Sequence, residues 1–217
     1  MQKSSPSSLF SRATVLFVFC SLSAMLWLSG CATPGIRSTQ RTFNTVIVDP
    51  GHGGKDNGAT ARSGLHEKDC TIAVGLDLRD ELRKAGYKVV MTRTSDVFIP
   101  LNDRAALSNR YHNAIYVSVH FNDSPCRAIH GTEVYYNSTQ AMPLARNILD
   151  SMDGLTTRRF IKHAHFRVLR LNENPAVLVE CAYLSNRAEA ASSGSEAFRH
   201  HLAQQIAIGI FKTRKGN

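Results

Sequence analysis

Three apolar runs of the chain each end at a side chain that could bind a metal or move a proton. His52 lies in a glycine-rich turn directly after the first run, His120 follows a second and Glu180 follows a third. Short apolar runs bounded by turn residues predict buried strands. Because ligands bind beyond the carboxyl ends of the strands in open α/β sheets, we expect the three side chains at one rim of a sheet.

A metal centre follows from these residue types. Zinc in a hydrolase takes three nitrogen or oxygen ligands and keeps one position open. His52 and His120 supply imidazoles, and Glu67, in a polar loop just before a predicted helix, is the best third ligand. The spacings, about 15 and 53 residues, match no local zinc motif, so spacing alone gives only a moderate signal. A lone histidine at a strand end is more often structural.

The elements that must position these side chains alternate along the chain. Strands are predicted at 46–48, 87–92, 114–119, 133–136, 166–169 and 176–179, and helices at 68–85, 101–111, 142–152 and 196–212. This alternation predicts one α/β domain of three layers, with a mostly parallel or mixed sheet of about six strands and helices on both faces. The domain is expected to span residues 44–217.

Six phrases of the sequence, in order, carry a resemblance to a known family. They are DPGHGGKDNGA, HEKD, TRTSD, LNDRAALSN, SVHFND and PAVLVECAYLSN. This arrangement resembles zinc-dependent N-acetylmuramoyl-L-alanine amidases of the Amidase_3 type. The resemblance implies one Zn²⁺ held by His52, Glu67 and His120, with Glu180 as the catalytic carboxylate. The implied substrate is peptidoglycan, cut at the amide between N-acetylmuramic acid and L-alanine.

Glu180 has a defined task in such a reaction. Zinc lowers the pKa of a bound water from 15.7 to about 7. The carboxylate can take that proton and hand it to the leaving amine. We prefer Glu180 to Glu133 because it ends the most apolar strand, where a charge without a task would be costly. The structural alternative is an ion pair between Glu180 and an arginine such as Arg93.

Three further residues are candidates for substrate binding. Asn122 could orient the substrate or cap a turn. His165 lies in the basic stretch 157–170 and could line the substrate groove. Arg93 could bind the substrate or form an internal salt bridge.

Two other functions remain open. A zinc exopeptidase of a related fold would use similar ligands, but usually with more carboxylates or a second metal. A non-catalytic peptidoglycan-binding lipoprotein would be expected to have lost a ligand or Glu180. All four residues are present.

The amino-terminal segment predicts export and lipidation. Residues 13–28 form an apolar run of about 24 Å as a helix, short of the roughly 30 Å hydrocarbon core, which favours a secretory signal. The run ends in Leu-Ser-Gly-Cys31, which resembles the bacterial lipoprotein signal box. The resemblance implies a signal peptide over 1–30 and lipidation of Cys31. Residues 32–43 lack periodicity and mix Pro, Gly, Ser, Thr and Arg, so a tether is predicted over 31–43. Because Ala32 rather than Asp follows Cys31, the resemblance also favours the outer membrane, facing the periplasm.

The net charge indicates which binding partners suit the protein, and the cysteine content limits the disulfides it can form. Without residues 1–30 the net charge is about +7, which suits an anionic wall polymer or lipid headgroups. No segment resembles a nucleic-acid module, and we expect a monomer. Three cysteines remain after processing, Cys70, Cys126 and Cys181, so at most one disulfide can form among them.

The segment between His120 and Glu180 bears on regulation. In regulated members of the family, an inserted helix in this segment covers the zinc until a partner removes it. Here the segment is about 60 residues long and must already hold several predicted elements, with connections of about 4 to 6 residues each. We therefore expect activity without an obligatory activator.

Overall fold

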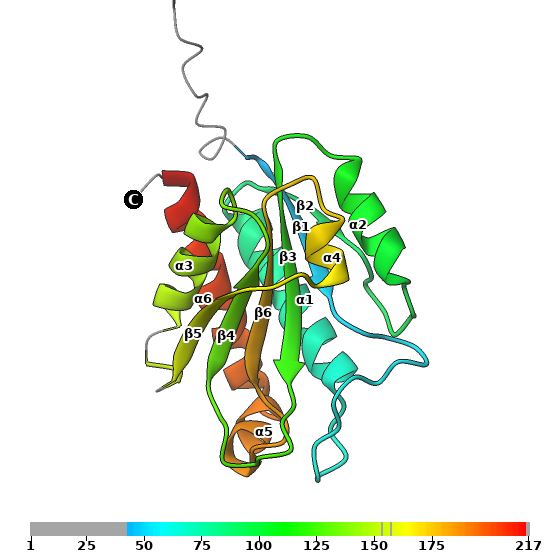
Figure 1. Cartoon of the computed structure of the whole chain (residues 1–217), viewed down its shortest axis with the longest axis vertical. Coiled ribbons are helices and arrows are strands. Elements are labelled where there is room, and N and C mark those ends of the chain that lie inside the picture. The colour runs from blue at the N-terminus through cyan, green and yellow to red at the C-terminus, as the bar shows by residue number, and fades with distance from the viewer. Residues whose placement is uncertain (1–42, 153, 157, 216–217) are drawn as a thin grey trace, which may run out of the picture. The chain divides into compact units, whose positions relative to one another are not determined.

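Six strands form one mixed sheet at the centre of the domain (Figure 1). The computed structural model describes residues 43–152, 154–156 and 158–215, so the predictions for 1–30 and for the tether up to residue 42 lie outside it. The strands are β1 Thr45–Pro50, β2 Lys88–Met91, β3 Ala114–Asn122, β4 Thr132–Tyr136, β5 Arg159–His163 and β6 Ala176–Tyr183, in the spatial order β2-β1-β3-β6-β4-β5. β4 pairs with β6 antiparallel and the other pairs are parallel. The predicted mixed sheet of about six strands is confirmed.

Helices cover both faces of this sheet (Figure 1). They are α1 Glu67–Lys84, α2 Leu101–Asn109, α3 Met142–Ser151, α4 Arg167–Arg170, α5 Arg187–Ser193 and α6 Glu196–Lys215. α6 packs against both α1 and α3, and α2 packs against α4. Among the described residues, no helix combines the length and the hydropathy needed to cross a membrane.

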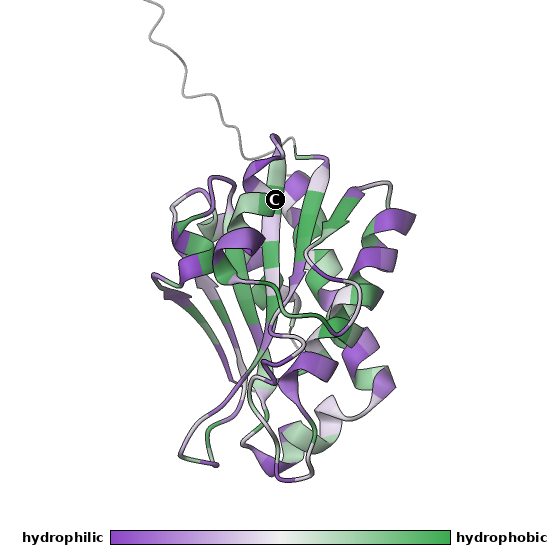
Figure 2. Ribbon diagram, turned by 90° about the vertical axis from the view of Figure 1, so that its right-hand side faces the viewer, coloured by the Kyte–Doolittle hydropathy of each residue, from purple (hydrophilic) through white to green (hydrophobic). Residues whose placement is uncertain are grey.

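The central strands are apolar on both sides because both sides are covered. All six residues of β1 are buried. Val46 and Val48 belong to the larger core, together with residues of α1, α3 and α6, whereas Ile47 belongs to a smaller core with residues of α4. Alternate residues of a strand point to opposite faces, so a strand buried on both faces reads as a continuous apolar run. Figure 2 shows this hydrophobic interior along the strands.

One predicted strand was wrong. Residues 166–169 were expected to form a strand, but Arg167–Arg170 is the short helix α4, and the strand is Arg159–His163. A short apolar run does not distinguish a strand from a buried helical turn. Val168 and Leu169 are buried in the smaller core, whereas β5 is an edge strand with a largely polar and half-exposed sequence. Helix α5 was not predicted.

Candidate metal centre

The ends of β1, β3 and β6 lie at the same edge of the sheet, as predicted. Pro50 pairs with Val119 across β1 and β3, and His120 pairs with Glu180 across β3 and β6. His52 stands just beyond β1 with a φ of 59°, an uncommon left-handed conformation for a residue other than glycine. The register of two parallel ladders therefore brings His52, His120 and Glu180 to one site.

Gly51, in the turn before His52, lies in close contact with the ring of His120. A Cβ added at Gly51 would lie 2.3 Å from His120 Cε1, closer than real atoms approach. The Gly51 amide donates to the Val119 carbonyl at 2.9 Å. Only glycine therefore allows this approach of β1 to β3, and the approach places the two imidazoles side by side, with ring centroids 4.8 Å apart.

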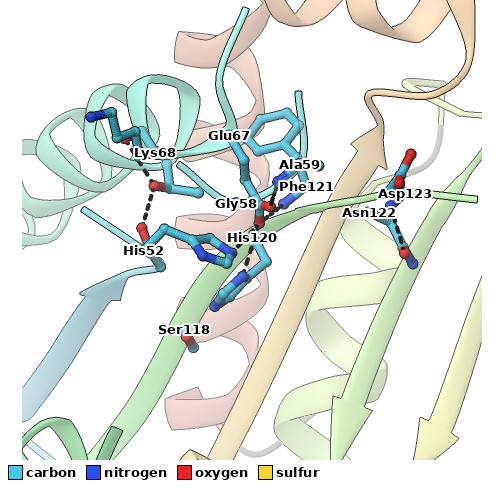
Figure 3. Close-up of polar contacts among 12 residues, drawn as sticks. His52, Gly58, Ala59, Glu67, Lys68, Ser118, His120, Phe121, Asn122 and Asp123 are labelled. Atoms are coloured by element: carbon cyan, nitrogen blue, oxygen red, sulfur yellow. Dashed lines mark hydrogen bonds and ion pairs between the residues drawn. The ribbon is translucent and has the colours of Figure 1, made fainter. Parts of the chain in front are cut away.

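His52, Glu67 and His120 converge on one point (Figure 3). Glu67 Oε1 lies 3.0 Å from His52 Nε2 and 2.9 Å from His120 Nδ1. One ligand atom from each residue lies within 4.8 Å of the others. Tetrahedral zinc with bonds of about 2.0–2.1 Å separates its ligands by roughly 3.3 Å. The donor types and their spacing therefore fit a zinc ion with one position left open.

Backbone amides fix the carboxylate of this set. Glu67 Oε1 also accepts a hydrogen bond from the Phe121 amide at 2.9 Å, and Oε2 accepts one from the Ala59 amide at 2.8 Å.

His52 Nδ1 lies 2.9 Å from Asp56 Oδ2, an ion-pair distance without the alignment of a hydrogen bond. A partner on the second ring nitrogen fixes the orientation of a metal-binding imidazole.

The electrostatics of the set favour a cation. Burial alone would raise the pKa of Glu67, but the hydrogen bonds from His120 and His52 hold that pKa far below its usual range. Burial lowers the pKa of each histidine, and the Glu67 carboxylate more than compensates, so both pKa values are raised. Glu67 is therefore ionised, and a cation bound here would replace the protons that the imidazoles otherwise carry.

Glu180 faces this set from β6. Its Oε2 is buried and has no hydrogen-bond partner among the described residues. Burial raises the pKa of Glu180 to about 7, against the opposing effect of His120. By contrast Glu133, which pairs with Glu180 across β4 and β6, is held by Lys162 at 2.6 Å and by the hydroxyl of Tyr135. Of these two carboxylates, Glu180 is the one with an unpartnered oxygen.

A cleft of about 800 Å³ opens over the candidate metal set and Glu180. Asn122 lines it, and its Nδ2 lies 3.4 Å from Glu133 Oε2. One wall is apolar, with Phe98 and Phe166 both 41% exposed. Neither phenylalanine was singled out from the sequence, because isolated exposed aromatics carry no periodic signal.

The structure does not bring Arg93 into this cleft. Arg93 is only 3% exposed. Its guanidinium donates to the carbonyls of Pro50, Gly51 and Lys68 at 2.8–3.0 Å. The alternative ion pair between Arg93 and Glu180 does not form, because the Arg93 guanidinium is bound to these backbone carbonyls. Arg93 instead joins the turn before His52 to the first turn of α1, which carries Glu67.

His165 also lies outside the residues that line the cleft, although the adjacent Phe166 is one of them. Its ring nitrogen Nδ1 lies 2.9 Å from Asn137 Nδ2.

Asn186 caps α5, accepting hydrogen bonds from two backbone amides. Cys70, Cys126 and Cys181 are free, so the single disulfide left open by the sequence does not form.

A buried ion pair between Arg104 and Asp49 supports the turn that carries His52. Arg104 donates to Asp49 Oδ1 at 2.7 Å and to the His52 carbonyl, also at 2.7 Å. Thr92, Tyr116 and Ser118 donate to the same carboxylate. The sequence could not single out Asp49, because nothing in the DPGHGG phrase distinguishes an acid that supports the turn from one that binds a metal.

Known proteins resemble this chain in sequence and structure. The family described as N-acetylmuramoyl-L-alanine amidase matches residues 46–212. The amidase AmiC of Neisseria meningitidis is 30% identical, over 76% of this chain and 51% of the relative, so the chain spans about half the length of that protein. The uncharacterized protein YqiI of Bacillus subtilis is 34% identical, over 76% and 82%.

Solved structures agree with these matches. The catalytic domain of the amidase CwlV from Bacillus (Paenibacillus) polymyxa superposes with a TM-score of 0.75 and 33% identity, over 81% of this chain and 100% of that one. The amidase AmiC2 of Nostoc punctiforme gives a TM-score of 0.73 and 35% identity, over 77% and 95%.

Proposed function

Because the chain belongs to the N-acetylmuramoyl-L-alanine amidase family, we propose that it is a zinc-dependent hydrolase of peptidoglycan. The bond cut is the amide between the lactyl group of N-acetylmuramic acid and the L-alanine of the stem peptide. The observation that carries this proposal is the convergence of His52, Glu67 and His120 beside the unpartnered carboxylate of Glu180. A non-catalytic wall-binding protein would have no need of a buried carboxylate without a partner.

Each residue of the set has a defined role. His52, Glu67 and His120 would hold a zinc ion, which when bound would polarise the substrate carbonyl and lower the pKa of a water. Glu180 accepts a proton from the attacking water at its free oxygen and delivers it to the leaving nitrogen. An amide nitrogen leaves poorly unless it is protonated, so a carboxylate that titrates near neutral pH suits both steps. Burial raises the pKa of Glu180 toward that range.

The exopeptidase alternative finds less support. Among the described residues, only one group of side chains is arranged to hold a metal ion. The phrases that surround it are those of the amidase family rather than of a peptidase with two metals.

Metal removal tests the zinc assignment. Exhaustive chelation should abolish hydrolysis of purified peptidoglycan, and Zn²⁺ should restore it. The metal content should be about one zinc per chain. Full activity of protein shown to be free of metal would contradict the proposal.

The lipid anchor is a second part of the proposal and lies outside the described residues. Lipidation at Cys31 would hold the enzyme at the outer membrane, facing the wall. Replacing Cys31 by Ser should move the protein out of the washed membrane fraction. An unchanged distribution would exclude lipidation as the anchor.

A further inference from the structure

A second cavity, of about 750 Å³, lies outside the metal centre. Three arginines line it, Arg62 from the loop between β1 and α1, Arg127 from the loop between β3 and β4, and Arg187 at the start of α5. All three are exposed, and none has a carboxylate partner among the described residues. No acidic side chain of that part of the chain lines the cavity. Three like charges around one hollow repel each other unless an anion joins them.

The backbone that carries these arginines is fixed. Asn186 Nδ2 donates to the Arg127 carbonyl at 3.0 Å, and the Ser124 amide donates to Ser185 Oγ at 2.9 Å. These bonds tie the β3–β4 loop to the turn after β6. Arg62 lies in a closed turn in which the amide of Ala61 donates to the Leu65 carbonyl at 2.9 Å. Three segments far apart in sequence thus hold their arginines around the same hollow, which small alanine side chains leave open.

One backbone hydrogen bond links the wall of this cavity to the wall of the catalytic cleft. Leu184 forms part of the cavity wall, and the Leu184 amide donates to the carbonyl of Asn122, which lines the cleft, at 2.8 Å. Figure 1 shows α5 and the β1–α1 loop at the edge of the sheet where β3 ends, the edge that carries the metal ligands. A substrate longer than the cleft would meet the cavity along this edge.

The chemistry of the proposed substrate decides which part extends there. The scissile amide joins a sugar to a peptide, so the glycan and the peptide extend from the metal centre in two different directions. The lactyl carboxyl is consumed in that amide, and the glycan strand is otherwise neutral. The free carboxylates are therefore on the peptide. The cleft wall with Phe98 and Phe166 suits the apolar face of a sugar, whereas the arginine cavity suits carboxylates.

We propose that Arg62, Arg127 and Arg187 form a subsite that binds the free carboxylates of the stem peptide. This inference rests on the proposed function and names the part of its substrate that the cavity recognises. Guanidinium groups bind carboxylates through paired hydrogen bonds. A protein with this subsite binds stem peptides with free carboxylates more tightly than peptides whose carboxyl groups are amidated.

Calorimetric binding of a free stem peptide to the full-length protein tests the subsite apart from catalysis. A tripeptide of L-alanine, γ-linked D-glutamate and a diamino acid contains no muramic acid bond and cannot be cleaved. It should bind more tightly than the same peptide with amidated carboxyl groups. Arg62→Gln, Arg127→Gln and Arg187→Gln should each weaken that binding roughly threefold to tenfold. Arg110→Gln, at the opposite edge of the sheet, is the matched control and should change nothing.

Equal binding of the free and amidated peptides, or normal binding by the three variants, would overturn the proposal. Vesicles of anionic phospholipid provide another arm. If only vesicle binding falls in the three variants, the anion is a phosphate headgroup and the subsite assignment is wrong. A protein that binds the peptide but releases nothing from peptidoglycan would contradict the proposed activity and leave the subsite standing.

Discussion

At the scale of single residues, Glu180 combines burial with the absence of a partner for one oxygen. A Gln side chain has nearly the same shape but cannot carry a proton between the water and the leaving nitrogen. Glu180→Gln should therefore keep the fold and the metal while lowering turnover by about 10²- to 10⁴-fold. Glu173→Gln, an exposed change before the same strand, is the matched control. A near-normal rate with bound zinc would remove Glu180 from the mechanism.

Asp49 gives a second prediction at this scale, on stability. Burial would raise its pKa, but Arg104 and the hydrogen bonds from Thr92, Tyr116 and Ser118 outweigh burial and lower it. A carboxyl whose folded pKa is lowered stabilises the fold above its unfolded pKa and loses that contribution as the pH falls through the folded pKa. Asp49→Asn leaves the Arg104 charge buried without its counterion, which should cost about 3–5 kcal/mol at pH 7.

Urea unfolding between pH 7 and pH 2 measures both effects. The wild type should lose stability below about pH 4 more steeply than Asp49→Asn. If the Asn variant fails to fold, Thr92→Val removes one hydrogen bond to the same carboxylate and should cost about 1 kcal/mol. Parallel pH dependence in the wild type and the Asn variant would show that Asp49 does not contribute in this way.

At the scale of elements, the packing of α6 on α3 depends on a glycine. A Cβ at Gly209 would lie 2.4 Å from Ile148 Cα and 2.7 Å from Ile148 N, so the backbone of α3 would have to move. Gly209→Ala should destabilise the protein by about 1–3 kcal/mol, although alanine is intrinsically the better helix former. Gly194→Ala is the control, because its Cβ would meet only ordinary contacts at 3.4 and 3.8 Å. Equal unfolding free energies for the two variants would contradict the close packing.

The elements also show what the sequence could and could not predict. β1, β3 and β6 are buried on both faces, so their apolar runs were visible, and a residue of the site lies at or just beyond the end of each run. β5 is an edge strand and α4 has four residues, so neither produces a full period of the pattern. The place of Arg93 depends on carbonyl groups that come together only in the folded loop. No pattern of side-chain types encodes such contacts.

At the scale of the whole molecule, the question is access to the metal centre. The side chains of His52 and His120 remain 22% and 18% exposed. Between Asn122 and β6 the described residues form β4, α3, β5 and α4, and α4 packs against α2. We therefore predict that the zinc-loaded protein cleaves isolated peptidoglycan without an activator, with its reach in the cell set by the proposed lipid anchor at Cys31. Release of labelled fragments by the purified protein measures this. Protein that stays inert until a second protein is added would place an inhibitory element within 121–179.

Mass analysis of the fragments released from purified peptidoglycan tests the central claim most directly. The zinc-loaded protein should release stem peptides with a free L-alanine amino terminus and leave glycan strands whose muramic acid carries a free lactyl carboxyl. The Glu180→Gln variant, loaded with the same metal, should release about 10²- to 10⁴-fold less of both products. Fragments cut within the peptide or within the glycan, with the lactyl amide intact, would contradict the account.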